Sequence, residues 1–123
     1  MGVIATNIKG GTRMSVRAYH FPKKIIAVDF DGCLCKNEYP EIGEPNHSVI
    51  EALQYEAQVS TNIILWTCRT GELLEKAVKW CDKWGVPYSF VNENDPSAIS
   101  RFGGDTRKVY ADEYWDDKAV TKP

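Results

Sequence analysis

The chain has 123 residues, of which 43% are hydrophobic and 26% are charged, and these values are typical of one globular domain with a single core. They exclude disordered, collagen-like and membrane-spanning classes, so we expect a soluble protein. The 15 basic and 17 acidic residues give a net charge of −2, which excludes a broad cationic face for coating nucleic acid.

Four cysteines are present: Cys33, Cys35, Cys68 and Cys81. Two disulfides and a zinc site are the alternatives to free thiols. No apolar signal-peptide core precedes the cysteines, and their spacing lacks the paired C-x-x-C knuckles that structural zinc prefers. We therefore expect reduced thiols, a cytoplasmic protein and no zinc. Cys33 and Cys35 follow an acidic motif. A redox role would explain cysteines at these positions, and so would the packing of small residues in a tight turn.

Residues 1–22 show no sustained hydrophobic period, so we expect an N-terminal arm of unknown role, followed by one domain over residues 23–123. The apolar run at residues 25–28 predicts a fully buried parallel strand, and it ends abruptly in Asp-Phe-Asp-Gly at residues 29–32. A loop is expected over residues 33–45.

A helix is expected after that loop, because Asn46 is a good capping residue and apolar residues recur behind it at three-to-four-residue spacing. A second buried strand is predicted over residues 63–66, with Thr67 directly after it. An apolar stripe predicts the next helix over residues 72–84, which Gly85 ends.

Three shorter elements complete the predicted order. Residues 88–91 read as a third strand, and Asp95 followed by proline opens a short helix that a glycine pair at 103–104 closes. The last strand is predicted over residues 109–115. Strands that alternate with helices indicate a mostly parallel sheet covered on both faces, so we expect an α/β, Rossmann-like three-layer sandwich with ligands at the carboxyl ends of its strands.

Acidic and hydroxyl side chains follow the ends of these strands: Asp29, Asp31, Thr67, Asp116 and Asp117. Any one of them is explained by a turn that reaches solvent. Together they place several carboxylates at one sheet edge, where they would repel one another unless a cation neutralised them. Carboxylate oxygens suit Mg²⁺ better than zinc or copper, so magnesium (Mg2+) is the expected cofactor.

These motifs, in this order, resemble the haloacid dehalogenase (HAD) superfamily of hydrolases. The resemblance covers residues 23 to about 118 and is carried by Val-Asp-Phe-Asp-Gly at 28–32, Leu-Trp-Thr at 65–67 with Arg69, Lys108, and Tyr-Trp-Asp-Asp at 114–117. It implies a HAD-like, Rossmann-like fold. The short stretch at 33–45 leaves no room for a substantial cap domain, although residues 39–43 offer a small flap.

The resemblance implies that Asp29 is a nucleophile that forms an aspartyl-phosphate intermediate. Asp31 would be the general acid and base, with its backbone carbonyl facing the metal. Asp116 would bind Mg²⁺ directly, and Asp117 would do so directly or through water. The expected metal set is therefore Asp29, Asp31, Asp116 and Asp117.

The resemblance also implies a phosphate-binding group. Thr67 and the following turn, with Cys68, would hold phosphate oxygens, against the alternative of a helix-capping threonine. Lys108 would place a cation beside the nucleophile and the phosphoryl group, with Arg107 as a possible substitute and a solvated lysine as the alternative. Arg69 is a further candidate for substrate contact, although exposed arginines are common after strands.

The resulting expectation is an enzyme, a Mg²⁺-dependent, HAD-type phosphatase that hydrolyses a phosphate monoester, with a nucleotide or a nucleic-acid end among the candidate substrates. The alternative is a phosphate-binding or phospho-accepting regulatory module without turnover, because receiver domains place similar carboxylates at a sheet edge. A retired scaffold is a third possibility. Substrate identity and oligomeric state remain open, and no membrane partner is expected.

Overall fold

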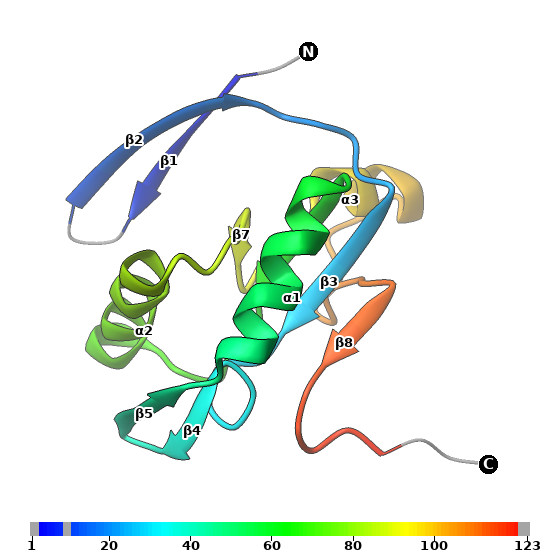
Figure 1. Ribbon diagram of the computed structural model, residues 1–123. Helices are drawn as coiled ribbons and strands as arrows, with labels where there is room; N and C mark the ends of the chain where they lie inside the picture. Colours follow the sequence, from blue (N-terminus) through cyan, green and yellow to red (C-terminus); the bar gives the residue numbers. More distant parts are fainter. Residues whose placement is uncertain (1–2, 9–10, 121–123) are drawn as a thin grey trace.

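A four-stranded parallel sheet forms the centre of the protein (Figure 1). The computed structural model describes residues 3–8 and 11–120. The strand order is β7-β6-β3-β8, and every neighbouring pair is parallel. The strands are β3 (Lys24–Val28), β6 (Thr61–Leu65), β7 (Phe90–Val91) and β8 (Glu113–Trp115). The predicted α/β, Rossmann-like architecture is confirmed.

Three helices cover the two faces of this sheet: α1 (His47–Gln58), α2 (Gly71–Trp84) and α3 (Pro96–Phe102). Successive side chains of a strand point to opposite faces, which is why a strand buried on both sides is apolar throughout. Val28 of β3 packs in one core cluster with Leu53 of α1 and Cys81 of α2. Ile25 belongs to a second cluster on the other face, where it lines a cavity with Ala98 of α3.

The helix ends follow the sequence signals closely. Asn46 occupies the N-cap position of α1, but its side chain accepts no bond from a backbone N–H of the helix, and its Oδ1 accepts from the Ser48 hydroxyl. Asp95 caps α3 through a bond from the Ser97 N–H, and Gly85 ends α2 in the left-handed conformation. Asp95 and Gly85 set their helix bounds because Asp95 satisfies an end N–H group and Gly85 adopts a backbone angle that other residues rarely adopt.

The stretch predicted as a loop over residues 33–45 contains a small antiparallel hairpin, β4 (Cys35–Glu38) and β5 (Glu41–Pro45). Its turn includes a cis peptide bond between Tyr39 and Pro40. Three of the four β4 residues are exposed, so the strand lacks the alternation by which strands are recognised. The hairpin stands at the end of β3 (Figure 1), beside the expected ligand edge.

The last strand is shorter than the predicted range of 109–115, because only Glu113–Trp115 pairs with β3. The preceding backbone bonds mostly to side chains. The Tyr110 N–H donates to Asn94 Oδ1 at 2.8 Å, and Val109 O accepts from the Tyr114 hydroxyl at 2.6 Å. At Asp112 the N–H donates to Ile25 O, and Oδ2 accepts from the Ile25 N–H, both at 2.8 Å. These bonds replace most of the ladder that a longer strand would need.

The N-terminal segment forms a hairpin of its own, β1 (Val3–Ile8) paired antiparallel with β2 (Gly11–Ala18). No strand was predicted there, and the role of the expected arm stays open. The Tyr19 hydroxyl donates to Asp95 Oδ1 at 2.5 Å and so connects the end of this segment to α3. Within the described residues, no helix is long and apolar enough to cross a membrane, and the four cysteines are free thiols.

Candidate functional site

Strand register brings the expected site residues together at one edge of the sheet. Val28 of β3 lies beside Leu65 of β6 on one side and Trp115 of β8 on the other. The Asp29 N–H donates to Trp115 O at 2.9 Å, which continues the pairing by one residue. Because the strands end level with one another, the residues that follow them meet, as expected for a parallel sheet.

Three carboxylates form a compact cluster at this edge: Asp29, Asp116 and Asp117. One oxygen from each lies within 4.8 Å of the others, with Asp29 half-buried and the other two exposed. Such an oxygen-only donor set fits a hard divalent cation such as Mg²⁺, which takes a few carboxylates and keeps several waters. The Asp31 carboxylate is outside this cluster, and the expected contribution of its backbone carbonyl stays a prediction.

The surroundings of Asp29 disfavour the charged form of its carboxyl group. Burial raises its pKa from 3.8 to about 6, and the nearby charges of Asp116 and Asp117 act in the same direction. The Phe30 N–H, which donates to Asp29 Oδ1 at 2.9 Å, partly opposes them. A bound cation would reverse the balance by stabilising the carboxylate.

Gly32 allows Asp117 to reach the cluster. Its φ of +89° is a conformation that other residues rarely adopt, and a Cβ at this position would lie 2.4 Å from Asp117 Oδ2. Both the backbone angle and the close approach therefore require glycine here. This explains why the acidic motif after β3 ends in glycine.

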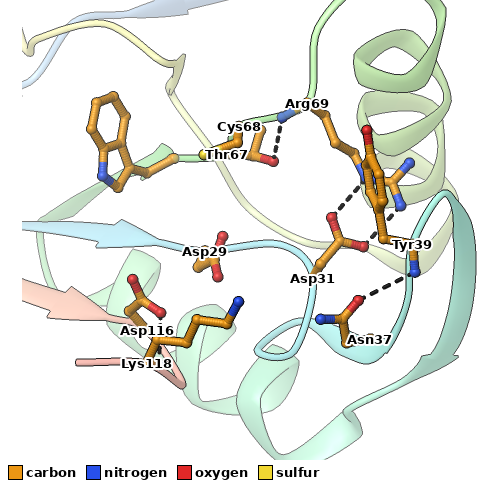
Figure 2. Close-up of a pocket in the computed structure, with 10 residues that line it drawn as sticks. Asp29, Asp31, Asn37, Tyr39, Thr67, Cys68, Arg69, Asp116 and Lys118 are labelled. Carbon is orange, nitrogen blue, oxygen red and sulfur yellow. Dashed lines mark hydrogen bonds and ion pairs between the residues drawn. The ribbon is translucent and has the colours of Figure 1, made fainter. Parts of the chain in front are cut away.

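The cluster opens into a cavity of about 510 Å³. Its lining includes most of the expected site residues and several that were not expected. The lining residues are Asp29, Asp31, Asn37, Tyr39, Trp66, Thr67, Cys68, Arg69, Asp116 and Lys118. Figure 2 shows Asp29 and Asp116 on one side of this space and Asp31, Arg69 and Tyr39 on the other.

Arg69, expected as a phosphate ligand, bonds to groups of the protein itself. Its Nε and Nη2 donate to the two carboxylate oxygens of Asp31, each at 2.8 Å. The other donated bonds go to the backbone oxygens of Pro40, Glu41 and Leu73, and the side chain is 1% exposed. The Arg69 donors are thus engaged by protein acceptors on Asp31, on the hairpin and on α2, and the expected contact with phosphate stays a prediction.

Thr67 is held by one hydrogen bond from its backbone and one to its side chain. Its N–H donates to Asn92 Oδ1 at 2.8 Å, and its Oγ1 accepts from the Arg69 N–H at 3.1 Å. In these two bonds the Thr67 hydroxyl acts only as an acceptor, so it can still donate its own proton. The Cys68 N–H takes part in neither bond. Thr70 occupies the N-cap of α2, so Thr67 is not the capping residue. Asn92, which follows β7 with φ of 54°, was missed because only the fold brings it here.

Lys108 lies outside this cavity, contrary to expectation. Its Nζ is 5.4 Å from the ring centroid of Tyr114, and neither it nor Arg107 belongs to the lining. Lys118 lines the cavity instead, and its side chain points toward Asp29 in Figure 2. Its N–H donates to Asp116 Oδ1 at 2.9 Å, which fixes its backbone beside the acidic cluster. Sequence reasoning missed Lys118 because it follows the acidic pair instead of preceding it.

The chain is similar to a conserved protein from Bacteroides thetaiotaomicron whose structure is solved. The two are 38% identical, the match covers 79% of this chain and 78% of that one, and the TM-score is 0.70. The two chains belong to one family. No model of a known protein family matches the chain, and no curated protein does. The similarity to the Bacteroides protein therefore establishes kinship and fold, and the chemistry must be argued from the site.

Proposed function

We propose that this chain is a Mg²⁺-dependent phosphohydrolase, similar to HAD-type phosphatases, that cleaves a phosphate monoester through an aspartyl-phosphate on Asp29. One observation carries the proposal. Asp29 shares a cation-sized carboxylate cluster with Asp116 and Asp117, beside a cavity that also contains Thr67 and a fourth, separately held carboxylate, Asp31. Paired carboxylates in different surroundings suit different roles in one reaction.

In the first step an Asp29 carboxylate oxygen attacks phosphorus and forms a new O–P bond, while the bond to the ester oxygen breaks. The leaving oxygen takes a proton from the carboxylic acid form of Asp31, so an alcohol departs and Asp31 is left as the carboxylate that Arg69 holds. Thr67 supports this step because its hydroxyl and the Cys68 N–H remain for the phosphoryl oxygens. Mg²⁺ held by the three clustered carboxylates would screen the negative charges that meet there.

In the second step water attacks phosphorus, the Asp29–phosphorus bond breaks, and Asp31 takes the proton of the water. Inorganic phosphate leaves and Asp29 returns to a carboxylate. The two bonds from Arg69 support this role because they hold the Asp31 carboxylate in one orientation. A fixed base close to the phosphorylated residue accelerates proton transfer.

Lys118 supplies the cation that we expected from Lys108. Phosphate brings further negative charge into a cavity already rich in carboxylates, and the two cationic residues of the lining are Arg69 and Lys118. Arg69 is committed to Asp31. Lys118 is therefore the residue proposed to contact the phosphoryl group.

The test is phosphate release from a panel of phosphate monoesters with Mg²⁺, by the full chain and by Asp29→Asn. A matched control is Asp105→Asn, which keeps the oxygen that accepts from Asn94 at 2.9 Å and lies outside the cavity. We expect release by the unmodified protein and by the control, and none by Asp29→Asn. Mg²⁺-dependent phosphorylation of Asp29 by acetyl phosphate without release would instead indicate the phospho-accepting module. If the protein neither releases phosphate nor becomes phosphorylated, both the phosphohydrolase and the phospho-accepting module are rejected.

A further inference from the structure

The turn of the hairpin β4–β5 carries Tyr39, an aromatic residue that contacts Arg69 and also lines the cavity. Arg69 Cζ lies 5.1 Å from the ring centroid of Tyr39 and 5.1 Å from that of Phe30. Tyr39 thus covers the buried guanidinium with one face of its ring. The residue is nevertheless 58% exposed and lines the cavity, so the opposite face is open.

Hydrogen bonds hold the backbone that carries this ring. Arg69 donates to Pro40 O at 3.2 Å and to Glu41 O at 3.0 Å, on the two residues that follow Tyr39. The Tyr39 N–H donates to Asn37 Oδ1 at 3.2 Å. A stacking surface that is already ordered loses little conformational entropy on binding.

Asn37 adds a polar group to the same wall. Its Oδ1 faces the Tyr39 N–H, and its amide nitrogen is turned toward the cavity in Figure 2. A primary amide has two N–H donors, so this nitrogen suits acceptors on a sugar or on the edge of a base. An open aromatic face beside an amide donor is a common way to hold a nucleobase.

The cavity contains both this wall and the reaction centre. Asp31, the residue proposed to protonate the leaving oxygen, and Tyr39 both line it, and Arg69 contacts both of them. The cavity volume of about 510 Å³ falls in the size range that holds a ligand with a phosphate, a sugar and a base.

We infer that the site takes a nucleoside monophosphate, with the phosphate at Asp29 and the base stacked on the open face of Tyr39. This inference rests on the proposed function for the placement of the phosphate. The placement of the base rests on the hairpin alone. Tyr39 and Asn37 are therefore substrate-binding residues that set specificity without taking part in bond breaking.

The test measures binding, so that it does not depend on turnover. Calorimetry on the full chain carrying Asp29→Asn, with Mg²⁺, compares adenosine 5′-monophosphate with ribose 5-phosphate, which lacks the base. We expect the nucleotide to bind at least about tenfold more tightly, as stacking of one base typically gives. Adding Tyr39→Leu should remove this preference, and Tyr39→Phe should keep it.

Tyr55→Leu is the matched control, since Tyr55 is 63% exposed on α1 and lies outside the cavity. It should leave the preference unchanged. Equal affinity for the two ligands, or a preference that survives Tyr39→Leu, overturns the inference. Phenyl phosphate that binds as tightly as the nucleotide, and is weakened by Tyr39→Leu, overturns the assignment to nucleotides. A nucleotide preference in a protein that releases no phosphate would reject the proposed function and leave the base site standing.

Discussion

Arg69 donates one hydrogen bond to each carboxylate oxygen of Asp31, both at 2.8 Å, from a side chain that is 1% exposed. The same guanidinium bonds to Pro40 O and Glu41 O in the hairpin. One side chain thus fixes the proposed acid and base and also the wall of the cavity. Bidentate pairs of this kind supply geometric precision as well as energy.

Removing this arginine should cost much of the stability of the protein. Arg69→Met leaves the Asp31 carboxylate unpaired and three backbone oxygens without their donor, and we expect a loss of about 3 kcal/mol in the free energy of unfolding. Arg107→Met, at an exposed position outside the cavity, should change it by less than about 1 kcal/mol. Urea denaturation followed by circular dichroism measures both. Equal losses in the two variants would show that the Arg69–Asp31 pair does not contribute to the free energy of unfolding.

Asp31→Asn should abolish turnover while leaving the nucleophile in place. Asparagine still accepts a hydrogen bond from Arg69, but it neither donates a proton to a leaving oxygen nor takes one from water. We expect phosphate release to fall about 10²- to 10⁴-fold, the usual effect of losing a general acid and base. Initial rates on the best substrate measure this, after circular dichroism confirms folding. Full activity in the variant would refute the proposed mechanism.

Lys118 and Lys108 give a matched pair for locating the catalytic cation. Lys118 lines the cavity, whereas Lys108 lies on the ring of Tyr114. Lys118→Met should lower kcat/KM about tenfold to a hundredfold, because an exposed cation contributes less than a buried one. Lys118→Arg should recover part of the loss, and Lys108→Met should have little effect. The reverse pattern would restore the assignment made from sequence.

The raised pKa of Asp29 predicts a characteristic pH dependence. Between its ordinary value of 3.8 and about 6, the folded protein holds a proton that the unfolded chain has released. This contribution to stability is complete below about pH 4 and is lost as pH rises through about 6. Without metal, Asp29→Asn should therefore be more stable than the unmodified protein above pH 6, by about 2 kcal/mol after a discount for partial exposure.

Mg²⁺ should offset the loss of stability that the charged Asp29 carboxylate causes above about pH 6. Because the ion binds the carboxylate form, it should raise the denaturation midpoint of the unmodified protein more at about pH 7 than at about pH 5. The shift should shrink in Asp29→Asn at both values. Urea denaturation at the two pH values, with and without Mg²⁺, gives all the comparisons. A stability difference between the two proteins that does not change with pH would contradict the role assigned to burial.

Gly32→Ala should disturb the carboxylate cluster of Asp29, Asp116 and Asp117 more than the fold. A Cβ there would meet Asp117 Oδ2 at 2.4 Å, at a φ of +89° that alanine rarely adopts. We expect a loss of about 1–3 kcal/mol in stability and a weaker response to Mg²⁺, because Asp117 must move. Gly104→Ala is the control, since a Cβ there has open space. Calorimetric titration with Mg²⁺ checks the outcome, and unchanged affinity would show that Asp117 is dispensable.

The central elements could be predicted from local pattern. The apolar run before Asp29 became β3, and the stripe over residues 72–84 became α2. Each depends on a period of two or 3.6 residues, or on burial on both faces, which a short window of sequence contains. The hairpin β4–β5 was not predictable in this way, because only Cys35 of β4 is buried.

Asp29 and Asp116 could be placed at one edge of the protein from sequence alone, because each follows a strand and the carboxyl ends of parallel strands coincide. The partner of Asp31 and the lysine that lines the cavity depend on the tertiary structure. It joined Arg69 to Asp31 and placed Lys118, not Lys108, in the cavity. Strand ends are set by local apolar runs, whereas a long side chain finds its partner through contacts between segments far apart in the chain, which no local pattern records.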